Sequence, residues 1–154
     1  MIEIKMASQE EQNLIKKNFE NQSSQQENDF CMVVKDGANI LGYSNGIIPH
    51  ESLAVITDLY ILPSERGLGF GDGLLRATFN SLELNGSKWV LIEGKDGLRD
   101  FLVHEDLCSL EQAPKSEEFE HVLGVWQKNL DRRKYFYCEP KEFFSRKCKG
   151  SKKV

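Results

Sequence analysis

The residues whose types and spacing best suit chemistry form a glycine-rich stretch from 62 to 74. Within it, glycines alternate with other residues at Gly67, Gly69, Gly71 and Gly73. Because glycine has no Cβ, such a stretch lets the main chain approach a ligand closely. If a helix begins here, its free amides and the positive end of its dipole attract an anion. Arg66 adds a positive charge. The stretch therefore predicts a site for phosphate oxygens.

Two common phosphate-binding motifs do not fit this stretch. A P-loop ends in Gly-Lys-Ser/Thr, whereas Gly73 is followed by Leu74. A dinucleotide fingerprint has glycines at offsets 0, 2 and 5. Counted from Gly67 the last of these is Asp72, and counted from Gly69 it is Leu74. Both motifs are excluded.

The elements that must position the stretch are a strand before it and a helix after it. Residues 53–62 are rich in β-branched and aromatic side chains and stop at Pro63, which cannot donate to a ladder. The helix after the glycines has an apolar stripe made of Leu74, Leu75, Thr78, Phe79 and Leu82. It ends at Asn85-Gly86, and the apolar run 88–93 follows as the next strand. This order predicts a βαβ unit with a right-handed crossover.

The rest of the chain adds antiparallel strands and further helices. We expect a polar loop at 21–29, bends at 44–46 and 49–52, and a first helix opened by a capping box of Ser8 and Glu11. A two-residue hairpin signal, Asp36-Gly37, joins two of the strands. The expected strands are 2–6, 30–35, 40–44 and 135–138, and the later helices are 98–107 and 117–130. The expected fold class is α/β (α+β), a three-layer αβα sandwich with a mixed, mostly antiparallel sheet.

The glycine-rich stretch also resembles a family motif. Arg66, Gly69 and Gly71 fit the pattern Arg/Gln-x-x-Gly-x-Gly/Ala, and residues 58–63 precede it as a strand. The stretch is similar to motif A of the GCN5-related N-acetyltransferases (the GNAT family), over about residues 53–93. The alternative is a turn that only packs a helix against a sheet. The resemblance implies a GNAT-like acyl-CoA N-acyltransferase fold with acetyl-CoA as cosubstrate.

The resemblance also implies a cofactor site. Backbone groups of three strand residues would bond the pantetheine arm, here Tyr60, Ile61 and Leu62. Amides of the turn would hold the pyrophosphate, here those of Arg66, Gly67, Leu68, Gly69, Phe70 and Gly71. Strand segments 59–62 and 90–93 would diverge, with the thioester in the gap.

The implied reaction is acetyl transfer to a primary amine by direct attack. A neutral amine is required, so a carboxylate or a water chain must accept a proton. Asp58 and Glu93, each at or near the expected divergence, are the candidate bases. Asp58 could instead be a structural carboxylate, and Glu93 a solvated strand end. Backbone amides near residues 60–62 could stabilise the developing oxyanion.

The sequence departs from the family after the fifth strand. Many members carry an Asn that contacts the cofactor and a Tyr that protonates the leaving thiolate, and Lys95 and Leu102 stand there instead. His104, Cys108 or Tyr137 could take the role of the Tyr. Two functions remain open: an active N-acetyltransferase, or an acetyl-CoA-binding module or sensor with little activity.

Composition limits the partners. The length predicts one domain over 1–154, with 135–154 as a late strand and basic tail. The net charge is -4; residues 132–154 carry nine basic and two acidic residues, about +7, so the rest carries about -11. An acidic body argues against a broad nucleic-acid surface and favours a cationic small-molecule or peptide amine. The sequence leaves a homodimer open.

Cysteine spacing and hydropathy bear on metals and location. Cys31, Cys108, Cys138 and Cys148 are scattered, without the paired spacing of a zinc site, so we expect free thiols and no metal. The first residues lack the pattern of a signal peptide, and no apolar run approaches the roughly 20 residues of a membrane span. We therefore expect a cytoplasmic protein with no membrane partner.

Overall fold

The computed structural model describes residues 1–19, 27–113 and 115–145 of the 154-residue chain. Its strands are β1 Ile2–Met6, β2 Phe30–Asp36, β3 Asn39–His50, β4 Leu53–Ile61, β5 Trp89–Glu93, β6 Cys108–Ser109 and β7 Tyr135–Cys138. Its α-helices are α1 Gln9–Asn18, α2 Phe70–Leu84, α3 Arg99–His104, α4 Glu117–Trp126 and α5 Pro140–Ser145. The strands form one seven-stranded sheet in the order β1-β2-β3-β4-β5-β7-β6.

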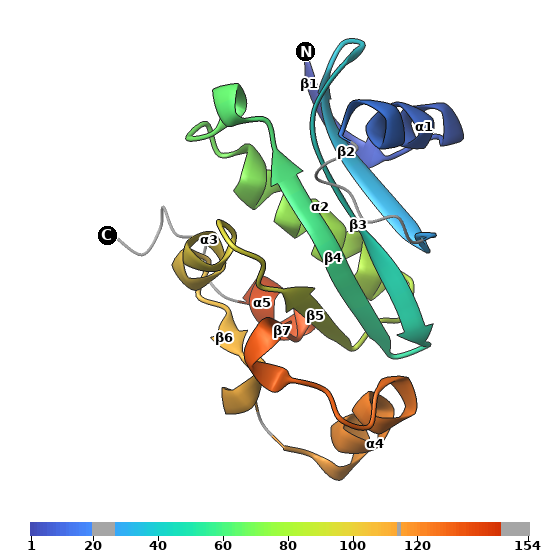
Figure 1. The fold of residues 1–154 in the computed structure, drawn as a ribbon, viewed down its shortest axis with the longest axis vertical. Coiled ribbons are helices and arrows are strands. Elements are labelled where there is room, and N and C mark those ends of the chain that lie inside the picture. Colours follow the sequence, from blue (N-terminus) through green and yellow to red (C-terminus); the bar gives the residue numbers. More distant parts are fainter. Residues whose placement is uncertain (20–26, 114, 146–154) are drawn as a thin grey trace.

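Helices cover both faces of the sheet, which confirms the predicted three-layer αβα class. Ile15 and Phe19 at the end of α1 pack on β2 and β3, and α4 packs farther along the same face, on β4, β5 and β7. The other face is covered by α2, with α5 and a residue of α3 beside it. Figure 1 shows α2 behind β3 and β4, with α1 and α4 toward the opposite ends of the molecule.

The parallel pair predicted on either side of the glycine stretch is present. β4 and β5 run parallel and are joined through α2, while the other paired strands of the described residues are antiparallel. Pairing between β4 and β5 runs from Leu53↔Trp89 to Ile56↔Ile92 and then stops, although β4 continues to Ile61. The two strands therefore separate beyond Ile56. The sequence analysis expected segments 59–62 and 90–93 to diverge, whereas residues 90–92 still pair with residues 54–56.

A β-bulge in β4 sets which side chains reach each face. Asn45 pairs with Asp58 and Gly46 with Ile56, so Thr57 is an extra residue between them. An extra residue shifts the alternation of a strand by one position. Accordingly, Ile56 packs with the α2 cluster, whereas Tyr60 packs with the α1 cluster. The bulge thereby places Asp58 on the face shared by α1 and α4, beside Asn45.

Several predicted boundaries are wrong, for local reasons. Residues 44–46 are not a bend, because β3 runs on to His50 and the irregularity is the bulge. The hairpin turn centres on Gly37-Ala38, since Asp36 pairs with Asn39. The helix expected at 117–130 ends at Trp126, although Leu130 still packs on the same cluster. The helix expected at 98–107 is shorter, Arg99–His104.

Other local predictions hold or cannot be judged. The capping box is present, with Ser8 accepting from the Glu11 amide and Glu11 accepting from the Ser8 amide. The late strand is β7, and Phe143 of α5 is buried, whereas Phe144 is exposed. Most of the polar run 21–29, Cys148 and the end of the basic tail lie outside the described residues.

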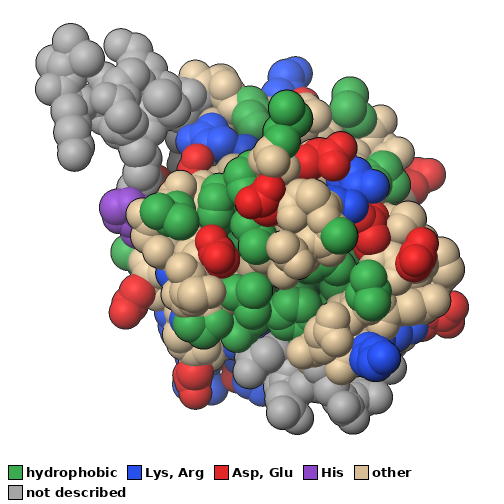
Figure 2. Space-filling view, turned by 90° about the horizontal axis from the view of Figure 1, so that it is seen from above, with side chains coloured by type: hydrophobic (Ala, Val, Ile, Leu, Met, Phe, Trp, Pro, Cys, Tyr) green, Lys and Arg blue, Asp and Glu red, His purple; other side chains and the backbone are tan. Residues whose placement is uncertain are grey.

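The end of the molecule that carries the β2–β3 turn is mixed in character. Figure 2 shows hydrophobic side chains gathered in the middle of this end, with acidic and basic side chains around them. None of the described helices is both long and apolar enough to cross a membrane.

Candidate active site

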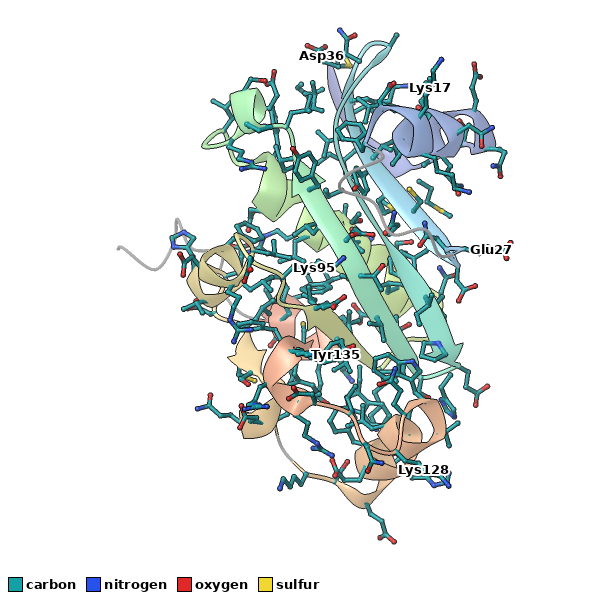
Figure 3. The ribbon with its side chains drawn as sticks, in the orientation of Figure 1. Lys17, Glu27, Asp36, Lys95, Lys128 and Tyr135 are labelled. Atoms are coloured by element: carbon teal, nitrogen blue, oxygen red, sulfur yellow. The ribbon has the colours of Figure 1, made fainter. Side chains whose placement is uncertain are left out.

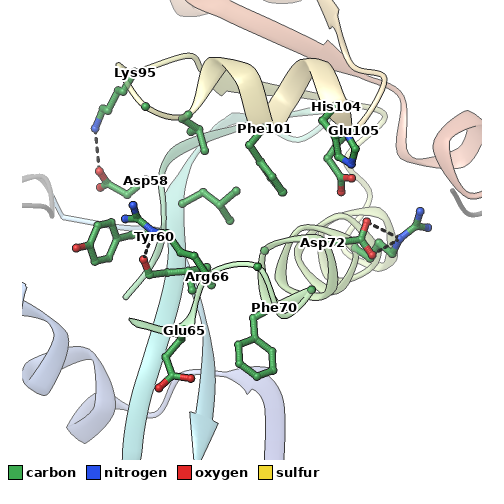
Figure 4. A pocket seen from close by; sticks show the side chains of 18 of the residues that line it. Asp58, Tyr60, Glu65, Arg66, Phe70, Asp72, Lys95, Phe101, His104 and Glu105 are labelled. Atoms are coloured by element: carbon green, nitrogen blue, oxygen red, sulfur yellow. Dashed lines mark hydrogen bonds and ion pairs between the residues drawn. The ribbon is translucent and has the colours of Figure 1, made fainter. Parts of the chain in front are cut away.

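A cleft of about 810 Å³ opens where β4 leaves β5. It is bordered by the end of β4, the turn and first residues of α2, the loop after β5, and α3. Figure 4 shows Lys95 and Asp58 at one end of this cleft, Asp72 at the other, and Phe101 over the middle. The predicted cofactor residues that line it are Tyr60, Ile61, Arg66, Gly67, Gly69, Phe70 and Gly71. Leu68 is instead 64% exposed, and Leu62 lines a separate depression beside α1.

The four alternating glycines serve two different needs. Gly67 and Gly69 have φ of +82° and +86°, a conformation that L side chains rarely adopt. Gly71 and Gly73 are needed for packing: an added Cβ would lie 3.1 Å from the Phe101 ring at Gly71, and 3.0 Å from Ile4 at Gly73. The first pair shapes the turn, and the second pair lets α3 and β1 approach α2.

The start of α2 presents free amides to the cleft. Gly69 caps the helix, and the first bond of the helix runs from the Gly73 amide to the Gly69 carbonyl at 3.1 Å. The amides of residues 70–72 precede that bond and have no partner within the helix. Together with the positive end of the helix dipole, they can bind an anionic group.

The end of β4 offers main-chain groups on its open side. The Leu62 amide donates to the Leu41 carbonyl at 2.8 Å, so it is directed toward β3 and away from the cleft. Because main-chain groups alternate in direction along a strand, those of Tyr60 also point toward β3. Those of Leu59 and Ile61 then point to the side that β5 has left. Leu59, which also lines the cleft, is a residue that the sequence analysis missed.

Arg66 stabilises the turn and also adds a positive charge to it. Its Nε donates to the Ile61 carbonyl at 2.9 Å, and its guanidinium lies 5.3 Å from the centre of the Tyr60 ring. The guanidinium therefore lies against the cleft, at the end of β4. It joins the glycine turn to the strand that precedes it.

The two candidate bases differ in position. Asp58 lines the cleft, and its side chain is only 3% exposed. Lys95 Nζ lies 2.8 Å from Asp58 Oδ1 and 3.9 Å from Glu93 Oε2. Glu93 lies at the end of β5, one-third exposed, and is not among the cleft-lining residues. Figure 3 shows Lys95 beside β4, near the middle of the molecule.

Comparison with known proteins decides the family. The model of the acetyltransferase (GNAT) family matches residues 2–91, more than half of the 154-residue chain. The chain belongs to the GNAT family. No curated protein sequence matches it.

Solved GNAT structures share the fold at low sequence identity. GCN5 from Tetrahymena has a TM-score of 0.67 at 10% identity, covering 89% of this chain and 95% of that one. Mutant forms of the spermidine/spermine N-acetyltransferase from Vibrio cholerae give 0.63 at 12%, covering 94% and 98%. A Brucella melitensis GNAT acetyltransferase in complex with acetyl-CoA gives 0.53 at 18%, covering 66% and 81%.

The sequence analysis placed Leu102 where many GNAT members carry a tyrosine, and Leu102 is not among the residues that line the cleft. Leu102 is fully buried in the core with residues of α2. Among the suggested substitutes, Cys108 and Tyr137 lie in the cluster under α4, on the other face of the sheet. His104 lines the cleft at the end of α3. The structure therefore brings only His104 of these three to the cleft.

Two further features of this GNAT cleft were not predicted. Phe101 packs over Gly71, and the Lys95 ammonium reaches across the divergence to Asp58. The β-bulge at Thr57 could have been detected in the sequence. Apolar residues of β4 recur at 54, 56, 59 and 61, so one interval is three residues instead of two. Among the described residues, no group of three or more potential metal ligands occurs.

Proposed function

We propose that this chain transfers the acetyl group of acetyl-CoA to a primary amine. The observation that carries the proposal is the cleft itself. It joins three features: the free amides at the start of α2, the open edge of β4, and a buried carboxylate, Asp58. The amides can bind an anion, the open edge of β4 can pair with an extended chain, and Asp58 can bind an amine.

The lining residues fit acetyl-CoA. The amides of residues 70–72 and the Arg66 guanidinium would hold the pyrophosphate, because both carry positive charge at the turn. Gly67 and Gly69 have positive φ and no Cβ, so at these two positions no side chain stands between the main chain and the cleft. The main-chain groups of Leu59 and the amide of Ile61 would pair with the amides of the pantetheine arm, as an added strand does, while the Ile61 carbonyl already accepts from Arg66.

The chain's own residues then prepare the acceptor. When bound, acetyl-CoA supplies an activated acyl group as a thioester, which a neutral amine attacks directly. Asp58 would orient the amine and accept its proton, with Glu93 near the same position. Phe101 lies over the middle of the cleft, where its ring would limit access of water to the bound thioester. His104 is the cleft-lining side chain that could return a proton to the thiolate.

A pair of glycine variants tests the cofactor site. Gly69 and Gly37 both have positive φ, and an added Cβ at either position meets nothing within 4 Å. Asn tolerates this conformation better than other residues do, so Gly→Asn adds bulk with little strain. Gly69→Asn should weaken acetyl-CoA binding at least about 10-fold, as measured by isothermal titration calorimetry. Gly37→Asn, in the β2–β3 turn, should leave the affinity unchanged. Unchanged affinity in Gly69→Asn would show that the site is misplaced.

One observation favours a second function, that of an acetyl-CoA-binding module with little activity. Leu102 is buried and cannot donate a proton, and Lys95 already engages Asp58. Thiol release measured with polyamines, aminoglycosides, amino acids and peptide N-termini separates the two. Release above the buffer rate with any amine supports the transferase. Acetyl-CoA binding without release across the panel supports the module.

A further inference from the structure

The cleft already contains a primary amine at its carboxylate. Lys95 extends from the loop after β5, and its Nζ lies 2.8 Å from Asp58 Oδ1 and 3.9 Å from Glu93 Oε2. Asp58 is 3% exposed at the side chain, whereas Lys95 is 42% exposed. The carboxylate is therefore a fixed part of the wall, while the lysine can turn out to solvent.

This arrangement shows which chemistry the position accepts. A lysine side chain is a primary ammonium at the end of an unbranched four-carbon stem. Its ammonium reaches Asp58 across the gap between β4 and β5, between cleft walls formed by Leu59 and Leu98 among others. A position that the unbranched lysine stem already occupies, and that ends in a buried carboxylate, suits a linear alkylamine better than a branched or aromatic one.

We propose, building on the acetyl-transfer function above, that Lys95 occupies the acceptor position. The acceptor is then a primary amine on an unbranched aliphatic chain, either a free polyamine or the side chain of a lysine. It displaces Lys95 from Asp58 when it binds. Lys95 is thus a specificity-determining residue that competes with the acceptor.

The charges around Lys95 support this exchange. Asp58 and Asp96 both line the cleft, and Glu93 Oε2 lies 3.9 Å from Lys95 Nζ. Two carboxylates thus lie within 4 Å of one ammonium, and a third, that of Asp96, lines the same cleft. Such an excess of negative charge attracts a second cation while Lys95 is still in place.

The transfer step balances with these groups. The acceptor nitrogen first loses a proton to the Asp58 carboxylate and then forms the new N–C bond with the acetyl carbon. The C–S bond breaks, the nitrogen gives up its second proton to solvent, and the thiolate takes up one proton from His104 or from solvent, which leaves a neutral amide and the CoA thiol. Asp58 returns its proton to solvent, so the chain is unchanged after one turnover.

Removing the Lys95 side chain provides the test. Lys95→Ala should accept a free amine in place of the missing side chain, so kcat/KM for n-butylamine should rise at least about 10-fold over wild type. Lys95→Gln, which keeps a long side chain near Asp58, should give a smaller rise. tert-Butylamine and benzylamine should gain less than twofold. Lys88→Ala is the matched control, because Lys88 is also ion-paired, to Glu118 at 3.3 Å, but lies outside the cleft.

The assay also separates the two sources of the amine and the two proposals. Spermidine and N-acetyl-lysine methylamide are compared on wild type, and the better substrate identifies a polyamine or a lysine side chain. An equal gain for branched amines, or no gain for n-butylamine while wild type acetylates other amines, overturns the Lys95 proposal alone. If wild type and Lys95→Ala both fail to bind acetyl-CoA in calorimetry, the proposed function falls and this inference falls with it.

Discussion

Glu11 and Asp58 are both buried carboxylates held by lysines, yet they lie in very different surroundings. Glu11 on α1 pairs with Lys35 at 2.6 Å and Lys5 at 3.2 Å, and it accepts from the Ser8 amide at 2.9 Å. These partners come from β1, β2 and its own helix cap. The group ties α1 to the edge of the sheet.

Asp58 has a similar ion pair, but its position differs. It follows the bulge in β4, at the point where β5 separates, and it borders the cleft. Its lysine comes from a loop and is 42% exposed. Burial and pairing are similar for the two carboxylates, so they do not by themselves indicate which one takes part in chemistry. The two carboxylates differ in their surroundings: the partners of Glu11 enclose it, whereas Asp58 borders the cleft.

The largest expected effect separates the two groups by activity. Asp58→Asn removes the proposed proton acceptor and the anchor for the amine, so kcat/KM for the best amine should fall roughly 100-fold or more. Acetyl-CoA affinity should change less than threefold, because the turn at the start of α2 is untouched. Steady-state thiol release and calorimetry measure these quantities.

Glu11→Gln is the control for that experiment. It alters a carboxylate of similar burial outside the cleft, so kcat/KM should stay within twofold of wild type. Equal losses of activity in the two variants would mean that Asp58 acts through stability alone, and the comparison would fail.

The two regions were predicted from the sequence to a similar extent. The capping box at Ser8 and Glu11 is a local pattern, and so is the glycine turn, so both could be identified from spacing. The ion pairs could not be, because Lys35 and Lys95 meet their carboxylates only after the sheet has formed. The order of the main strands and helices could also be predicted, because it follows from the local periodicity of apolar residues.

The errors follow from effects that act between strands. The bulge at Thr57 appears as a pairing irregularity, and the sequence analysis placed a bend in the partner strand instead. The end of α4 was placed too late because Leu130 is partly buried without being helical. Apolar spacing reports burial, and burial continues past the end of a helix.

A smaller effect, on stability, should appear at Glu11. The hydrogen bonds from Lys35 and Ser8, together with Lys5, lower the pKa of Glu11 to about 2. Glu11→Gln weakens these charge-assisted bonds, so we expect a loss of about 2 kcal/mol in the free energy of unfolding at pH 7. Urea unfolding followed by circular dichroism measures it.

The pH dependence gives the sign of this effect. The folded-state pKa of Glu11 lies below the ordinary value of 4.5, so its contribution is fully present above about pH 4.5. It is lost as the pH falls from there toward about pH 2. The stability difference between wild type and Glu11→Gln should therefore be constant from pH 7 to pH 5 and shrink at lower pH. A difference that grows on acidification would contradict the role assigned to the ionised carboxylate.

The smallest expected effect concerns Tyr43, which lies between the two regions. It packs against Phe19 at the end of α1 and against Tyr60 near the cleft, with ring centroids 5.3 and 6.1 Å apart. The side chain is fully buried, and its hydroxyl makes no hydrogen bond with the described residues. Burial, with the Asp58 charge nearby, raises the pKa of Tyr43, so the hydroxyl stays neutral.

A buried hydroxyl without a partner costs free energy, so Tyr43→Phe should unfold at the same or slightly higher urea concentration. We expect a gain of at most about 1 kcal/mol, with the aromatic packing retained. A loss of stability would mean that the hydroxyl is satisfied in the folded protein. If kcat/KM falls while stability is kept, the hydroxyl belongs to the acceptor site with Asp58, and the open region extends from β4 to β3. If kcat/KM and stability are both unchanged, Tyr43 belongs to the hydrophobic core alone. The acceptor site around Asp58 then begins at the β4 bulge and does not extend toward Glu11.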